Sequence, residues 1–153
     1  MLDMDRIKSD FAHALRCGCS ESGCMLRLDG LRDRVVLKGE ELCQDRKMCD
    51  CIIFIVDSSV VIGVAELKSK TIRTSAVADK LANGSEIALD IFEKYAGRRM
   101  KLRIYHLLLH SGLDSSERRK IERKRIKVRG KGYDIITKPC GVHLSAVISQ
   151  FRK

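Results

Sequence analysis

Two apolar segments constrain the fold of this chain more than any other feature. Residues 50–56 (DCIIFIV) and 60–68 (VVIGVAELK) are dominated by β-branched and apolar residues, which favour strands, and Asp57-Ser58-Ser59 supplies a turn between them. Neither segment alternates cleanly between apolar and polar residues. Because continuous apolar strands are buried on both faces, the sequence predicts a hairpin within a sheet that helices cover on both sides.

The rest of the chain predicts further helices and strands around this hairpin. Before it we expect a helix over 2–15, a cysteine-rich loop and a short strand at 33–38. After it come a helix and a fourth strand. The helix is capped by Thr74 or Ser75, ends at Gly97 and carries a kink or break at Asn83-Gly84, and the strand covers 100–109. The last expected elements are a basic helix from Ser115 or Ser116, strands at 125–129 and 133–137, and a helix at about 142–151.

The hairpin brings charged residues together at one end. If its turn centres on Ser58, antiparallel pairing sets position 50 opposite position 66, with Cβ atoms about 4.5–5.5 Å apart on one face. Lys68 lies two residues after Glu66 and projects from the same face. A slip of one residue would place Asp50 and Glu66 on opposite faces, so the prediction depends on this register.

Asp50, Glu66 and Lys68 form the candidate catalytic group. Two adjacent carboxylates repel each other, and a lysine or a divalent cation offsets that cost. Magnesium prefers oxygen ligands and is usually held by one or two carboxylates together with phosphate oxygens. The alternative is that these residues are polar strand ends, with Asp50 and Lys68 paired across the sheet.

These residues also resemble a known signature. Asp50 at the start of one strand, Glu66-Leu67-Lys68 at the end of the next, and the helix that follows resemble the PD-(D/E)xK motif. The αβββαβ order of residues 2–109 is similar to the core of that restriction-endonuclease-like superfamily. Among its small members, the archaeal-type Holliday-junction resolvases are similar in length, charge and motif spacing.

The resemblance implies a fold and an activity. The fold is an α/β domain with a mixed central sheet flanked by helices. The activity is metal-dependent endonuclease hydrolysis of phosphodiester bonds in DNA, including branched or structured duplexes. Asp50 and Glu66 would ligate Mg²⁺ or Mn²⁺, the Leu67 carbonyl would be a further ligand, and Lys68 would orient or activate water. The chain departs from the pattern in two places: Cys49 stands where Pro is frequent, and residues 2–15 lack the glutamate of the resolvases, for which Asp10 or Glu40-Glu41 are candidate replacements.

A basic segment predicts a polyanionic partner. The chain has a net charge of +10, and residues 117–132 hold nine Lys/Arg against two Glu. Aromatic residues are scarce there, which favours contact with a duplex backbone over base stacking. The alternative is a solvated surface that keeps the protein in solution. The candidate nucleic-acid-binding residues are Arg118, Arg119, Lys120, Arg123, Lys124, Arg125, Lys127, Arg129 and Lys131.

Cysteines and histidines supply weaker candidates. Cys17, Cys19 and Cys24 are a candidate zinc site, although their spacing differs from the usual CxxC pairs, and the alternative is plain buried or loop thiols. Cys51 is expected to pack as a small apolar side chain. His106 and His110 share a strand face and are interpreted as core or edge histidines.

Length and composition bound the remaining expectations. The 153 residues predict a single domain over 1–153, with a core at about 2–109 and a basic extension at about 115–153. No apolar run approaches the ~20 residues of a membrane span, and the N-terminus does not resemble a signal peptide, so we expect a cytoplasmic protein without membrane contact. DNA is the expected partner, and a symmetric substrate would suit a homodimer. Two alternatives stay open: a non-catalytic nucleic-acid-binding module on the same fold, and a zinc-stabilised interaction protein.

Overall fold

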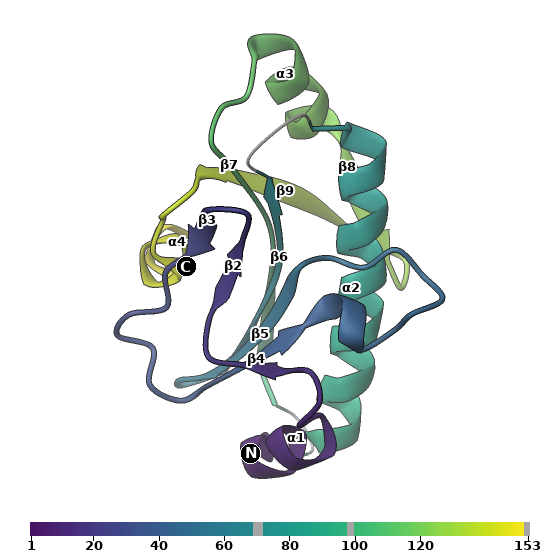
Figure 1. Ribbon diagram of the computed structural model, residues 1–153. Helices are drawn as coiled ribbons and strands as arrows, with labels where there is room; N and C mark the ends of the chain where they lie inside the picture. Colours follow the sequence, from purple (N-terminus) through teal and green to yellow (C-terminus); the bar gives the residue numbers. More distant parts are fainter. Residues whose placement is uncertain (69–71, 98–99, 152–153) are drawn as a thin grey trace.

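The computed structural model describes residues 1–68, 72–97 and 100–151, and within them the chain forms four α-helices and a mixed seven-stranded sheet (Figure 1). The helices are α1 (Met4–Asp10), α2 (Thr74–Tyr95), α3 (Ser115–Arg123) and α4 (Leu144–Phe151), with a 3-10 turn, η1 (Gly39–Glu41). The strands are β1 (Leu15–Arg16), β2 (Cys19–Glu21), β3 (Cys24–Leu26), β4 (Arg34–Lys38), β5 (Cys51–Val56), β6 (Val60–Lys68), β7 (Leu102–His110), β8 (Arg125–Val128) and β9 (Lys131–Pro139).

The main sheet has the order β1-β4-β5-β6-β7-β9-β8, and β2 and β3 form a separate hairpin. The strands from β1 to β6 pair antiparallel, β7 joins β6 and β9 in parallel, and β8 pairs antiparallel with β9. The expected single α/β domain with a mixed sheet is therefore confirmed. The basic C-terminal segment is part of this sheet, because β9 and β8 extend it on the far side of β7.

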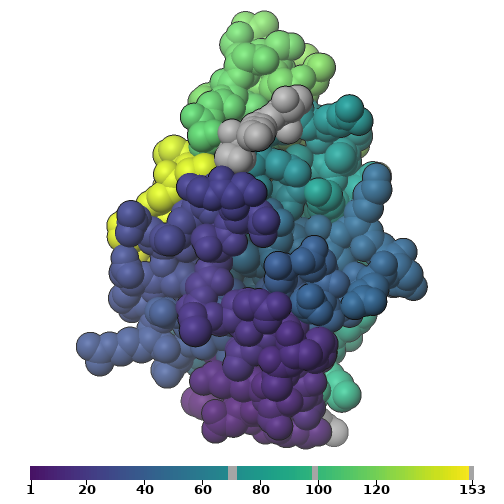
Figure 2. Space-filling model, in the orientation of Figure 1, coloured from purple at the N-terminus to yellow at the C-terminus, as the bar shows by residue number. Residues whose placement is uncertain are grey.

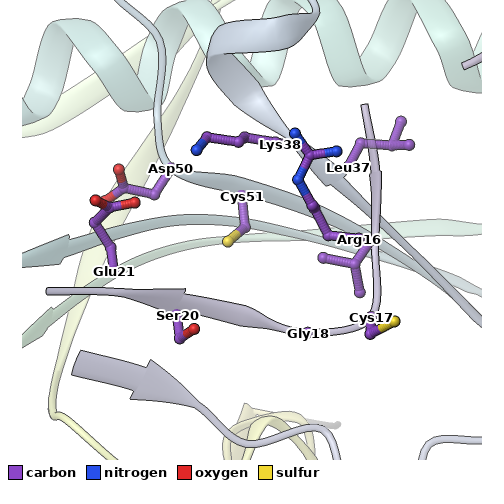
Figure 3. Close-up of a pocket in the computed structure, with 10 residues that line it drawn as sticks. Arg16, Cys17, Gly18, Ser20, Glu21, Leu37, Lys38, Asp50 and Cys51 are labelled. Carbon is purple, nitrogen blue, oxygen red and sulfur yellow. The ribbon is translucent and has the colours of Figure 1, made fainter. Parts of the chain in front are cut away.

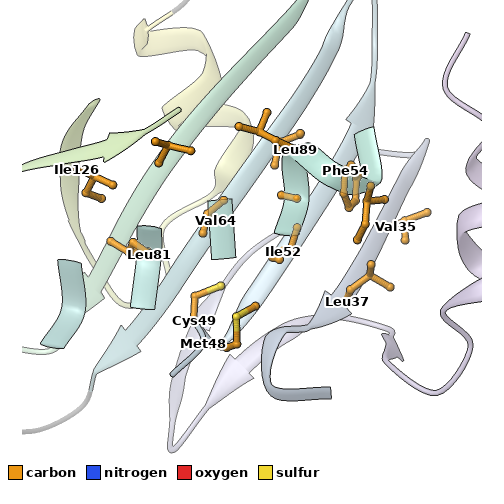
Figure 4. Close-up of a cluster of buried hydrophobic side chains, with 14 of the residues drawn as sticks. Val35, Leu37, Met48, Cys49, Ile52, Phe54, Val64, Leu81, Leu89 and Ile126 are labelled. Atoms are coloured by element: carbon orange, nitrogen blue, oxygen red, sulfur yellow. The ribbon is translucent and has the colours of Figure 1, made fainter. Parts of the chain in front are cut away.

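Both faces of the sheet are covered, as the apolar strands predict. Ile52 and Val64 face α2 and pack with Leu81 in one apolar core (Figure 4). Residues of opposite parity, such as Ile53, face α4 and pack with Leu144 in a second core. The β2–β3 hairpin covers this second face together with α4, because Cys19 and Leu26 belong to the same core.

Helix α2 runs unbroken through Asn83-Gly84, so the expected kink is wrong. Gly84 is instead a point of close approach, since a Cβ there would collide with Cys49 Sγ and lie 3.0 Å from Val64. The expected N-cap is also wrong. The helix begins at Thr74 itself, whose hydroxyl donates to Glu117 Oε2 of α3 at 3.2 Å.

The N-terminal region differs most from expectation. The helix is shorter than predicted: Asp3 caps α1 by accepting from Arg6 N, and the helix ends at Phe11. The cysteine-rich segment is the β2–β3 hairpin, which turns at Ser22-Gly23, where both residues have positive φ. Such two- and three-residue strands carry no readable periodicity. Figure 2 shows this N-terminal part along one side of the molecule and α3 projecting at the opposite end from α1.

Candidate functional site

The start of β5 and the end of β6 meet at one edge of the sheet. The register is the predicted one, since Cys51 pairs with Ala65 and Val56 with Val60 around a turn centred on Ser58. Asp50 lies just before β5, outside the paired register: its N–H donates to the carbonyl of Ala65, the residue that pairs with Cys51, at 3.0 Å. Its carboxylate Oδ2 accepts from Leu67 N–H at 2.7 Å, which ties the acid directly to the end of β6.

Glu66 is fully buried at this edge and is surrounded by cations. Its Oε2 lies 3.3 Å from Lys68 Nζ and 3.1 Å from Lys80 Nζ of α2. Neither Glu66 oxygen has a hydrogen bond of acceptable geometry among the residues that the structure describes. Lys80 was missed by the sequence interpretation. The only local signal is its position between Val77 and Leu81, which lie on the buried side of α2.

The two acids influence each other electrostatically. Burial and the charge of Glu66 raise the pKa of Asp50 to about 7, and the nearby Lys68 opposes that shift. Burial works to lower the pKa of Lys80, but the charge of Glu66, hydrogen bonding to Glu66 and Lys68, and the charge of Asp50 together outweigh it, so the pKa of that lysine is raised. Asp50, Glu66 and Lys68 therefore form one interacting group, to which α2 adds a second lysine.

These residues fit a divalent cation through two carboxylates and a backbone carbonyl. The Glu66 oxygens lack hydrogen bonds, and Leu67 presents its N–H and carbonyl to the Asp50 side of β6, because both groups of a paired strand residue point to the same neighbour. In residues 1–68, 72–97 and 100–151, no group of three or more His, Cys, Asp or Glu side chains is arranged to hold a metal. The acidic side chains that this end of β6 brings together are therefore the pair Asp50 and Glu66.

The expected replacements for the missing helix glutamate lie in different surroundings, and only Asp10 is remote from Asp50. Asp10 accepts a hydrogen bond from Tyr95 at the opposite end of α2. Glu40 is exposed and pairs with Lys38 at 3.0 Å. The additional acid near Asp50 is Glu21 of β2, which lines the same pocket and lies beside it in the close-up (Figure 3). The sequence placed Glu21 in a loop and offered no signal for this position.

The nine candidate nucleic-acid-binding residues are all exposed, but they do not form one free surface. Arg129, at the turn between β8 and β9, is engaged in ion pairs with three acids of α2: Glu86, Asp90 and Glu93. Arg125 lies 3.8 Å from Asp134, and Lys120 lies 3.3 Å from Glu117. The remaining residues are Arg118, Arg119, Arg123, Lys124, Lys127 and Lys131.

Helix α3 brings part of this basic surface close to the acid pair. The bond between Thr74 and Glu117 holds α3 against the first turn of α2. Arg118 of α3 lies near enough to His110, at the end of β7, to lower its pKa. Since β7 ends beside β6, α3 and the acid pair belong to the same end of the molecule (Figure 1).

The two histidines of β7 have different surroundings. His106 lies in the core, where its ring is 4.9 Å from that of Tyr133 and burial lowers its pKa to about 4. The interpretation as a core histidine is therefore confirmed for His106. His110 is the register partner of Lys68, and burial and then Arg118 lower its pKa. Its Nδ1 has no partner in the described part of the chain.

The predicted zinc site is wrong, because two of its three cysteines are in disulfides. Cys19 is bonded to Cys51 and Cys24 to Cys140. Cys51 packs in the second apolar core, as expected, and is bonded there to Cys19. Cys17, Cys43 and Cys49 are free. The bonded pairs are separated by 32 and 116 residues, so their proximity depends on how the hairpin and the C-terminal segment pack.

The fold and site thus define a single α/β domain in which buried Glu66, half-buried Asp50 and two lysines meet at one end of the central strands. No family model, no curated protein and no solved structure matches this chain. None of the helices in the described ranges combines the length and apolarity needed to cross a bilayer.

Proposed function

We propose that this chain is a Mg²⁺-dependent endonuclease that hydrolyses phosphodiester bonds in DNA, with a restriction-endonuclease-like core. The observation that carries the proposal is the meeting of Asp50 and Glu66 beside Lys68 at one edge of the sheet. The order of the long elements supports the core, because α1, the antiparallel strands β4 to β6, α2 and the parallel strand β7 follow one another as the PD-(D/E)xK resemblance implies.

Each residue has a role that its surroundings favour. Asp50, Glu66 and the Leu67 carbonyl would hold the cation, which would supply positive charge to polarise the phosphate group. Lys68 is partly exposed and can hold a water molecule or a phosphate oxygen with its ammonium protons. Lys80 places a positive charge 3.1 Å from Glu66 on the α2 side and so offsets the negative charge of the buried carboxylate.

The basic surface on α3 favours a nucleic acid as the substrate. Arg118, Arg119 and Arg123 are exposed on the helix that lies beside the acid pair. Arginine and lysine contacts with the phosphate backbone position a duplex without reading its sequence. Duplex DNA, including branched DNA, is therefore the proposed substrate class.

A cleavage panel tests this proposal. Purified protein is incubated with linear duplex, branched and single-stranded DNA, with Mg²⁺, with Mn²⁺ and with EDTA. We expect metal-dependent cleavage of a duplex or branched substrate, its loss in Glu66→Ala, and its loss in Lys68→Ala with DNA binding retained. Asp5→Ala is the matched control, because Asp5 is an exposed acid of α1, at the opposite end of the molecule from α3 and the acid pair. Absence of cleavage on every substrate, or full activity of Glu66→Ala, would overturn the proposal.

A non-catalytic nucleic-acid-binding module is the second candidate. The observation that favours it is the contact of Glu66 with both Lys68 and Lys80, which already neutralises the carboxylate without a metal. Such a module would bind DNA with a steep salt dependence, and Mg²⁺ would change neither its thermal stability nor the DNA. Mg²⁺-dependent stabilisation that disappears in Asp50→Asn would favour the nuclease instead.

A further inference from the structure

His110 ends β7 directly beside Lys68. The strands β6 and β7 are parallel, and the Cα atoms of Lys68 and His110 are register partners. Adjacent strands lie about 4.8 Å apart, and register partners project from the same face. Leu108, two residues earlier, packs in the α2-side core, so His110 faces the side of the sheet on which Glu66 meets Lys80.

The imidazole of His110 is buried at the end of β7. Only 8% of the residue is exposed, and its Nδ1 has no hydrogen-bond partner in the described residues. A buried polar atom without a partner destabilises the folded state. Such atoms in a folded protein need an explanation, and a ligand that completes the hydrogen bond is one.

The charges around His110 indicate what that ligand is. Lys68 is its neighbour on β6, and Arg118 approaches from α3 closely enough to affect its ionisation. Burial and then Arg118 lower the pKa of the ring, which favours the neutral imidazole, in which one ring nitrogen carries a proton that it can donate in a hydrogen bond. A neutral hydrogen-bond donor that has Lys68 and Arg118 nearby favours an anionic ligand. A phosphate that contacts both Arg118 and Lys68 would lie over His110.

We propose that His110 is a catalytic residue that donates a hydrogen bond to a non-bridging oxygen of the scissile phosphate. This inference rests on the proposed nuclease function and extends it. Hydrogen-bond donors that are already in place stabilise the negative charge on the phosphate oxygens in the transition state. Loss of one such donor typically slows the reaction about 10²–10³-fold.

His106 supplies the matched control. It lies on the same strand and the same face, four residues earlier, but it is enclosed in the core against Tyr133. Substitution of either histidine by leucine removes one buried imidazole and keeps an apolar side chain of similar volume. A structural role would therefore affect both variants alike, whereas a role in phosphate binding affects only His110.

The experiment measures single-turnover cleavage of the best DNA substrate in Mg²⁺, DNA affinity in Ca²⁺, and urea denaturation. We expect His110→Leu to cleave roughly 100-fold more slowly, with unchanged or increased resistance to urea, because an unpartnered polar atom is removed. His106→Leu should cleave within about threefold of the wild-type rate, which is small beside the loss of a donor. Added imidazole should restore part of the rate of His110→Ala and none of the rate of Glu66→Ala.

Three outcomes would overturn the inference. The first is wild-type cleavage by His110→Leu while Glu66→Ala is inactive, which leaves the nuclease proposal standing without His110. The second is an equal loss of rate in both leucine variants, together with no rescue of His110→Ala by imidazole. The third is no cleavage by the wild-type protein on any substrate, which removes the proposed function and the role of His110 with it.

Discussion

Glu66 is a carboxylate in a position from which solvent is excluded. A buried charge is expensive unless it is paired, and here Lys68 and Lys80 both approach the same oxygen. Asp50 adds a second acid, and burial together with the charge of Glu66 raises its pKa. This local cost makes the group a candidate for function, because perturbed ionisable groups concentrate at functional sites.

His106 makes the stability of the protein depend on pH. Burial holds its pKa at about 4, below the ordinary value of 6.5, so the folded protein keeps it neutral. Its contribution to stability is present above pH 6.5 and is lost as the pH falls toward 4, because only the unfolded chain binds the proton there. Between pH 7 and 4, urea denaturation should show the wild type losing about 3 kcal/mol more than His106→Leu. Parallel losses in the two proteins would contradict this assignment.

Helix α2 is the element that joins the site to the core. It spans the sheet from the acid pair, which Lys80 contacts, to the N-terminal helix, where Tyr95 bonds Asp10. Arg129 attaches the β8–β9 turn to its acidic side through Glu86, Asp90 and Glu93. The position of α2 above β6 therefore determines whether Lys80 reaches Glu66.

Close packing at Gly84 sets that position, and a double-mutant cycle can measure it. A Cβ at residue 84 would meet Cys49 Sγ, so Gly84→Ala should lower the free energy of unfolding by roughly 1–3 kcal/mol despite the better helix propensity of alanine. In a Cys49→Ala background most of this loss should disappear, giving a coupling energy of about 1 kcal/mol or more. Gly112→Ala, which meets nothing within 4 Å, is the control. If the effects of Gly84→Ala and Cys49→Ala on the free energy of unfolding are additive, the two residues are not coupled and the close contact does not set the position of α2.

At the scale of the whole molecule, two disulfides hold the β2–β3 hairpin to the second face of the sheet. Cys19 attaches the hairpin to β5 one residue after Asp50, and Cys24 attaches it to Cys140, four residues before α4 begins. Glu21 lies between the two attached cysteines of the hairpin. The disulfides thus position this pocket-lining acid as well as the cover of the core.

Removal of either disulfide should lower the free energy of unfolding, and the loss should be larger for the disulfide that closes the longer loop. We expect Cys24→Ser/Cys140→Ser to lose about 2–4 kcal/mol, and Cys19→Ser/Cys51→Ser to lose less, because its loop of 32 residues is shorter than 116. Urea denaturation measures both, and Cys43→Ser serves as the free-thiol control. Thiol titration of the unfolded, unreduced protein should find three thiols of the seven cysteines. Seven titratable thiols before reduction would contradict the pairing.

Local sequence determined the elements whose pattern lies within a few neighbouring residues. The apolar runs and the short turn were sufficient to predict the β5–β6 hairpin and its register, because alternation and turn length fix which residues oppose each other. The sequence pattern alone was therefore sufficient to predict that Asp50, Glu66 and Lys68 lie together. The strands β7, β8 and β9 and the helix α3 were also predicted close to their observed bounds.

Only the tertiary structure decided which distant segments complete the site. Lys80, His110 and Glu21 come from a helix, a parallel strand and a hairpin, and no local pattern records that these elements pack against the β5–β6 hairpin. The same holds for the disulfide partners of Cys19 and Cys24. The physical reason is that periodicity reports which face of an element is apolar, whereas the partner of that face depends on how all the apolar faces are buried together.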